Sequence, residues 1–196
     1  IEALKKQRYD FVFLDLEMPE PYTPKAPTTN GTDDYRCFLL DPKLEDPAFV
    51  TGVNVVPGKP DLVHHVIMFR VGPKAVAEAE AADAAVDGQG WTCFGGAAIG
   101  SDYSRGLDRA PWLGAWAPGT GESMLEPDIG MPLEAGSRIV MQVHYNLLAG
   151  AQPDVSATRL RLADGDRDLA ALETMLYPAP VELPCRPGRA SGELCG

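Results

Sequence analysis

Glycine and proline interrupt this chain from end to end, and that spacing limits it to short extended segments. The 196 residues include 20 glycines and 18 prolines, which lie between apolar runs along the whole length. Glycine and proline weaken or break helix interiors, so the pattern disfavours a helical bundle. It favours many short strands joined by turns.

The apolar runs predict about eight strands and one helix. The strands are expected at residues 9–16, 35–40, 49–56, 62–71, 113–117, 138–147, 155–162 and 169–177. Residues 74–86 are rich in Ala and Glu and predict the one short helix. The expected fold class is therefore all-β, an antiparallel β-sandwich or jelly roll. No strand–helix alternation supports a Rossmann-type fold.

The three histidines of the chain all lie in two of these expected strands. His64 and His65 are adjacent in one apolar run, and His144 lies in another. A histidine buried without a partner costs free energy, and imidazole is the commonest metal ligand in proteins. One metal ion bound by all three is the economical hypothesis. Because neighbours on a regular strand point to opposite faces, the strand must bulge or twist at His64, or the metal must lie at its edge.

Other interpretations of these polar residues stay open. His64 could be hydrogen-bonded inside while His65 faces solvent, and His144 could be a hydrogen-bonded core residue. Gln142 shares the face of His144 on a regular strand, so it is either an outer partner of a metal ligand or a polar residue beside the site. Four carboxylates near loops form no motif with the histidines and are interpreted as solvated surface: Glu122, Glu126, Asp128 and Glu134.

Charge and hydropathy exclude several classes of partner. The formal net charge of −11 argues against a surface for nucleic acid or anionic lipid. No apolar run approaches the roughly 18–20 residues that span a membrane. No signal peptide is visible, and the chain begins at Ile1 rather than Met, which we interpret as a processed or trimmed form.

The chain has four cysteines, an even number. Cys37 and Cys93 adjoin aromatic residues, whereas Cys185 and Cys195 lie in a tail rich in Pro and Gly. Two disulfides, Cys37–Cys93 and Cys185–Cys195, would fit a secreted or extracytoplasmic protein. The alternative is four free thiols in a cytosolic protein. No CxxC spacing suggests a zinc site.

Five short sequence motifs occur in the same order as in a known protein family. They are Asp34–Phe38, Val63–Phe69, Trp91–Cys93, Ala115–Gly119 and Gln142–Tyr145. In this ordered set, over roughly residues 15–180, the chain resembles the N-terminal domain of the copper type II, ascorbate-dependent monooxygenases. That family includes peptidylglycine α-hydroxylating and dopamine β-monooxygenases.

The resemblance implies a role for particular residues. It implies that His64, His65 and His144 hold the first, electron-transfer copper, and that Cys37 pairs with Cys93. A further family disulfide begins just after the His-His strand, where this chain has Val71 and no nearby partner cysteine.

The resemblance also implies a second domain, which carries a His-x-His pair, a methionine, the catalytic copper and the substrate pocket. This chain has no His-x-His. We therefore expect a copper-binding sandwich at 15–180, an N-terminal extension or edge strand at 1–14, and a linker at 181–196. With ascorbate as reductant, it would supply electrons to a C-terminal catalytic domain that hydroxylates a small molecule or peptide, and would hydroxylate nothing alone. The alternatives are a non-enzymatic copper-handling domain and a zinc hydrolase with three histidine ligands.

Residues 9–20 show a second, local resemblance. They resemble the phospho-acceptor strand of a response-regulator receiver, with Asp15 as the acceptor. No upstream acidic pair and no parallel α/β pattern accompany the segment. The other interpretations are an edge strand with a coincidental turn, or a foreign segment at the terminus.

Overall fold

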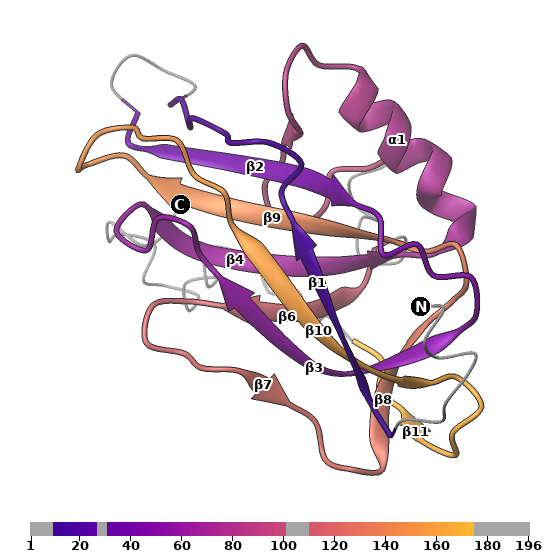
Figure 1. Cartoon of the computed structure of the whole chain (residues 1–196). Helices are drawn as coiled ribbons and strands as arrows, with labels where there is room; N and C mark the ends of the chain where they lie inside the picture. Colours follow the sequence, from indigo (N-terminus) through magenta and orange to yellow (C-terminus); the bar gives the residue numbers. More distant parts are fainter. Residues whose placement is uncertain (1–9, 27–30, 101–109, 175–196) are drawn as a thin grey trace, which may run out of the picture.

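Two β-sheets account for most of the fold, and their strands cross in the view of Figure 1. The computed structural model describes residues 10–26, 31–100 and 110–174. One sheet has the order β1-β10-β3-β8-β11, with β7 added on β3, and the other has the order β5-β2-β9-β4-β6. The predicted all-β sandwich is confirmed.

The strands and helices have the following bounds: β1 Val12–Glu17, β2 Asp33–Leu40, β3 Ala48–Val56, β4 Val63–Val71, the 3-10 turn η1 Pro73–Ala75, α1 Val76–Ala84, β5 Trp91–Thr92, β6 Trp112–Trp116, β7 Ser123–Met124, β8 Ile129–Leu133, β9 Arg138–Asn146, β10 Ala157–Asp164 and β11 Ala170–Ala171. All eight expected strands have a counterpart, and α1 lies within the expected helix. The strand expected at 169–177 is strand only over β11, and residues 175–177 lie outside the described ranges. Pairing is antiparallel except between β11 and β8, which run parallel.

Three strands were not predicted: β5, β7 and β8. Two of them have only two residues, too few to show an alternating pattern. The third, β8, contains Gly130 and Pro132, which normally argue against a strand. Pro132 lies opposite Phe49 of β3. On the other side of β8, the strand β11 pairs only with Ile129 and Gly130 and does not reach Pro132. The missing amide donor of Pro132 is therefore tolerated there.

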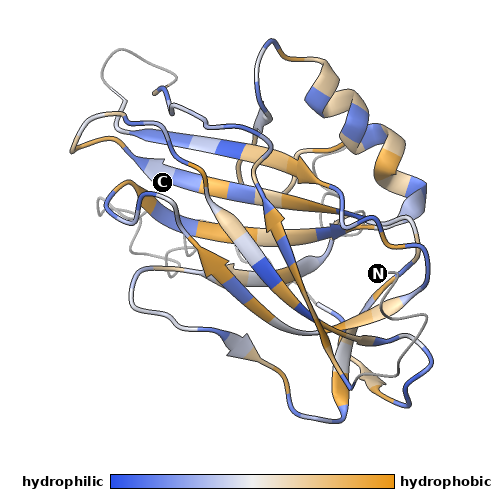
Figure 2. Cartoon of the chain, in the orientation of Figure 1, coloured by the Kyte–Doolittle hydropathy of each residue, from blue (hydrophilic) through white to orange (hydrophobic). Residues whose placement is uncertain are grey.

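The alternation of β9 divides the apolar residues between two faces. Ile139, Met141, Val143 and Tyr145 are buried in the core between the two sheets. Val140 belongs to a second cluster on the outer face of the β9 sheet, with Cys37, Phe69, Trp91 and Ala79 of α1 among its members. Figure 2 shows hydrophobic residues concentrated on the strands of both sheets. Because most residues of β9 are buried, polar residues on its outer face need partners.

The N-terminal strand belongs to the sandwich. All six residues of β1 pair antiparallel with β10, and Asp15 forms an ion pair with Arg159 at 2.7 Å. The strand therefore crosses the boundary expected between residues 14 and 15. An antiparallel edge strand agrees with the edge-strand interpretation and gives the receiver resemblance no support. Residues 1–9 and 181–196 lie outside the described ranges.

Among the described residues, no helix combines the length and apolar character needed to cross a bilayer.

Candidate metal centre

A β-bulge in β4 brings the two adjacent histidines to one place. Val63 pairs with Tyr145 and His65 pairs with His144, so His64 is an extra residue without a counterpart in β9. An extra residue interrupts the strict alternation of a strand, and both imidazoles can then turn to the same side. The irregularity in the strand that two adjacent metal-binding histidines would require is confirmed.

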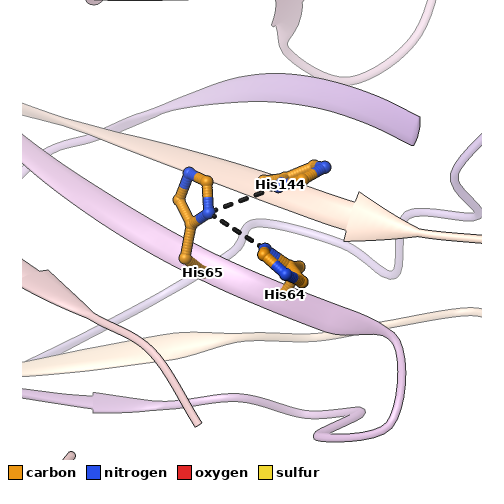
Figure 3. Close-up of side chains that lie close together, drawn as sticks. All are labelled: His64, His65 and His144. Atoms are coloured by element: carbon orange, nitrogen blue, oxygen red, sulfur yellow. Dashed lines mark hydrogen bonds between the residues drawn. The ribbon is translucent and has the colours of Figure 1, made fainter.

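The three imidazoles converge through the same ring atom (Figure 3). The Nδ1 of His65 lies 3.2 Å from the Nδ1 of His64 and 3.2 Å from the Nδ1 of His144. One nitrogen from each ring lies within 4.8 Å of the other two. In a tetrahedral site with metal–nitrogen bonds of 2.0–2.1 Å, two ligand nitrogens lie about 3.3 Å apart. The spacing therefore fits one metal ion bound by three Nδ1 atoms.

His144 is oriented from both sides. Its Nε2 lies 2.8 Å from Oδ1 of Asp33, and its ring stacks on Tyr35 with centroids 4.1 Å apart and planes 7° from parallel. If Nε2 carries the proton and donates it to the carboxylate, the lone pair of Nδ1 is left for a metal. The hydrogen bond with His144, and a weaker effect of Thr32, lower the pKa of the Asp33 carboxyl. The charged Asp33 carboxylate therefore favours the tautomer of His144 with the proton on Nε2.

The site opens toward solvent on one side. His144 is buried, His65 is half-buried and His64 is exposed. Burial, and secondly the neighbouring His144 and His64, lower the pKa of His65. A metal ligand must be the neutral imidazole, so this shift keeps His65 available for a metal to lower pH.

Gln142 is hydrogen-bonded to the segment that follows β5. It lies on the outer face of β9 with His144, but its amide nitrogen donates to the carbonyl of Gly96 at 2.8 Å and lies 3.4 Å from Sγ of Cys93. Gln142 thus fastens the segment after β5 to the sheet. No hydrogen bond joins it to a histidine among the described residues.

The disulfide Cys37–Cys93 is present and joins β2 to the end of β5, while Cys185 and Cys195 lie outside the described ranges. Its neighbour Phe94 is 75 % exposed and packs edge-on against Tyr35 at 4.9 Å. The disulfide therefore supports the same aromatic residue that stacks on His144.

Two contributors to the site were missed in the sequence, Asp33 and Tyr35. Both lie on β2, where Tyr35 pairs with His144 and Asp33 with Asn146. Only the pairing of β2 with β9 brings them to the histidines, and no local spacing signals it. The four loop carboxylates Glu122, Glu126, Asp128 and Glu134 are exposed, as interpreted from the sequence.

No model of a known protein family matches the chain, and no curated protein matches it either. What the site can do therefore follows from its own donor set. Three imidazole nitrogens with an open side suit zinc, copper, iron or nickel. The cluster of His64, His65 and His144 can therefore hold a metal ion.

Proposed function

We propose that this chain is the electron-transfer copper domain of a copper- and ascorbate-dependent monooxygenase. The observation that carries the proposal is the convergence of three Nδ1 atoms across the β4 bulge, with His144 oriented by Asp33. The five sequence motifs, in their order along the chain, support the same monooxygenase family. His64, His65 and His144 would hold the ion.

Copper is favoured over zinc by what surrounds the donors. Hydrolytic zinc needs a base beside the bound water. Asp33 accepts a hydrogen bond from Nε2 of His144. This atom lies across the ring from Nδ1, which faces the other histidines. Asp33 therefore acts on the ligand and not on the open position. An all-imidazole set suits copper in both of its common oxidation states.

Copper bound here would supply a one-electron couple, and the residues of this chain would control it. The Asp33–His144 contact and the Tyr35 ring would restrict reorientation of one ligand. Little movement of the ligands between oxidation states makes electron transfer easier. On its buried side, the cluster would be shielded from water.

The proposal extends to a larger protein. A second copper domain would carry out hydroxylation of a C–H bond with O2, on a small-molecule or peptide substrate, with ascorbate as the external reductant. The Cys37–Cys93 disulfide is compatible with an extracytoplasmic location, which belongs to the same proposal.

Titration of the chain with copper tests the site directly. The chain has only three histidines, so every imidazole signal reports on it. Wild-type protein should bind one copper ion per chain, and nitrogen coupling in the electron paramagnetic resonance spectrum of Cu(II) should show imidazole ligation. His144→Ala should weaken binding by more than about 100-fold, beyond the effect of losing an outer partner. The exposed residue Gln152 provides the control Gln152→Ala, which should bind as wild type does.

Stoichiometric copper binding that survives His144→Ala would refute the site. Tight binding of zinc with hydrolysis of activated esters, and no reduction of the copper-loaded protein by ascorbate, would favour the zinc hydrolase instead.

A further inference from the structure

A cleft of about 800 Å³ lies beside β2, and the proposed metal site does not use it. Among the described residues no histidine lines this cleft, although Asp33 and Tyr35, which contact His144, form part of its wall. Its size lies within the range typical of small-molecule sites. The cleft is therefore a candidate binding site in its own right.

Carboxylates outnumber basic side chains in the wall of the cleft. The acidic residues are Glu20, Asp33, Asp34 and Asp87, and the basic residues are Lys25 and Arg36. The Arg36 guanidinium is already engaged, because its Nε donates to the Gln89 carbonyl and its charge lies over the Tyr22 ring at 5.2 Å. The chain as a whole carries a net charge of −11. The cleft therefore repels anions and attracts cations.

The carboxylates of the cleft do not converge as the ligands of a small metal ion would. Asp34 is buried and accepts hydrogen bonds from the Tyr22 hydroxyl at 2.7 Å and from the Lys25 amide at 2.8 Å. Asp33 accepts from His144. In the described part of the chain, only the three histidines form a group of three or more potential ligands close enough to share a metal ion. The wall therefore suits a larger cation, which several carboxylates attract from a distance.

Aromatic rings form the other part of the wall. Tyr22, Tyr35 and Phe94 all line the cleft. One face of Tyr35 is stacked on His144, whereas Phe94 meets Tyr35 edge-on and is 75 % exposed. The disulfide at the residue before Phe94 ties this segment to β2. A fixed, exposed ring beside carboxylates attracts a cation to its face.

These features favour a cation without N–H groups. An ammonium with N–H donors needs acceptors that replace its water, and the buried acceptor Asp34 already serves two donors. Glu20 and Asp87 are exposed to solvent, so they supply attraction rather than a dry set of acceptors. A quaternary ammonium has no N–H to satisfy and can pack its methyl groups on an aromatic ring.

We propose that the cleft binds a small quaternary ammonium compound, with the cation against Phe94 and its charge balanced by Glu20 and Asp87. A trimethylammonium group occurs both in free small molecules and in the phosphocholine headgroup of lipids. The acidic wall favours the free molecule, because it repels the phosphate. Binding needs no metal ion, so this inference stands or fails independently of the proposed function.

The first test titrates the metal-free chain with choline at low ionic strength and follows binding by NMR shifts. A ligand of this size is expected to have a Kd of about 1 mM. The neutral isostere 3,3-dimethyl-1-butanol has a carbon in place of the quaternary nitrogen and should bind about tenfold more weakly. Ethanolammonium, which carries three N–H donors, should also bind more weakly than choline, and so should phosphocholine.

Two variants test the wall of the cleft. Phe94→Leu keeps an apolar side chain but removes the ring face, and should weaken choline binding about fivefold. Asp87→Asn removes one charge and should weaken choline binding about threefold, an effect that added salt should reduce. Leu148, which is 79 % exposed, and the exposed Asp128 do not line the cleft. The controls Leu148→Ala and Asp128→Asn should therefore bind choline as wild type does.

Several results would overturn the inference. It fails if choline shows no saturable binding, if 3,3-dimethyl-1-butanol or ethanolammonium binds as tightly, or if Phe94→Leu and Asp87→Asn bind choline as wild type does. Tighter binding of phosphocholine would overturn the assignment to a free molecule in favour of a lipid headgroup. Displacement of choline by Ca²⁺, where Na⁺ at equal ionic strength has no effect, would assign the acidic wall to a metal ion instead.

Discussion

Removing the carboxylate of Asp33 should weaken metal binding without removing a ligand. Asp33 accepts one hydrogen bond, at 2.8 Å, from the ring of His144 whose Nδ1 faces the other two histidines. Loss of such an outer partner typically lowers metal affinity by about 10- to 100-fold. The Asp33 side chain is 43 % exposed, so solvent screens its charge. For a substitution that keeps an acceptor oxygen, the loss of metal affinity should therefore lie near the lower end of that range.

Two variants separate the charge from the hydrogen bond. Asp33→Asn retains an acceptor oxygen and should weaken copper binding by about tenfold, whereas Asp33→Ala removes the acceptor and should approach 100-fold. Competition with a chelator of known copper affinity measures both values. Asp128 is an exposed carboxylate away from the cluster, so Asp128→Asn is the control for a simple loss of charge.

A second measurement tests the reason for the effect. In the metal-free wild type, the ¹⁵N shifts of His144 should show the tautomer with a proton on Nε2, and in Asp33→Ala they should show a mixture. Copper affinity of Asp33→Ala within twofold of wild type, or an unchanged tautomer, would refute the reasoning.

Three further predictions concern the scaffold. Replacing Cys37 and Cys93 together by Ala should lower the free energy of unfolding in urea by about 4 kcal/mol, because the bond closes a loop with a sequence separation of 56; a loss under 1 kcal/mol would contradict this. Burial, and then the neighbouring Asp34, raise the pKa of Tyr22 above its usual value near 10, so its contribution to stability is full below that pH and declines as pH rises further; in urea melts the decline should be smaller in Tyr22→Phe. Gly90 has a φ of +62°, and an added Cβ would lie 2.1 Å from the Cys37 carbonyl oxygen, so Gly90→Ala should lower Tm clearly, whereas Gly72→Ala, with nothing within 4 Å, should not.

The sequence predicts the long strands because each has to bury a face. In β9 the apolar residues Ile139, Met141 and Val143 alternate with residues on the outer face, and that period is visible without any structure. The short strands β5 and β7 lack such a period. Their strand conformation depends on the neighbours with which they pair, so it is fixed only by the tertiary fold.

The candidate site divides in the same way. His64, His65 and His144 could be identified because polar residues in apolar runs need an explanation. Asp33 and Tyr35 could not, because an aspartate at the start of a strand and a tyrosine within one are ordinary residues. Their importance depends on the register between β2 and β9. Register follows from side-chain packing over the whole sheet rather than from any short segment.

The position of the cluster within the sheet explains why the site can be both precise and accessible. The second apolar cluster, with Ala79 of α1 and Phe69 of β4, covers one end of the outer face. His65 and His144 lie toward the other end of β4 and β9, where they form a cross-strand pair. The covered end fixes the register of the two strands, and a register error of one residue would turn His144 into the core. The bulge at His64 then adds a third imidazole from the same strand. The paired strands thus position two of the imidazoles, one local irregularity supplies the third, and the open end leaves the cluster within reach of solvent.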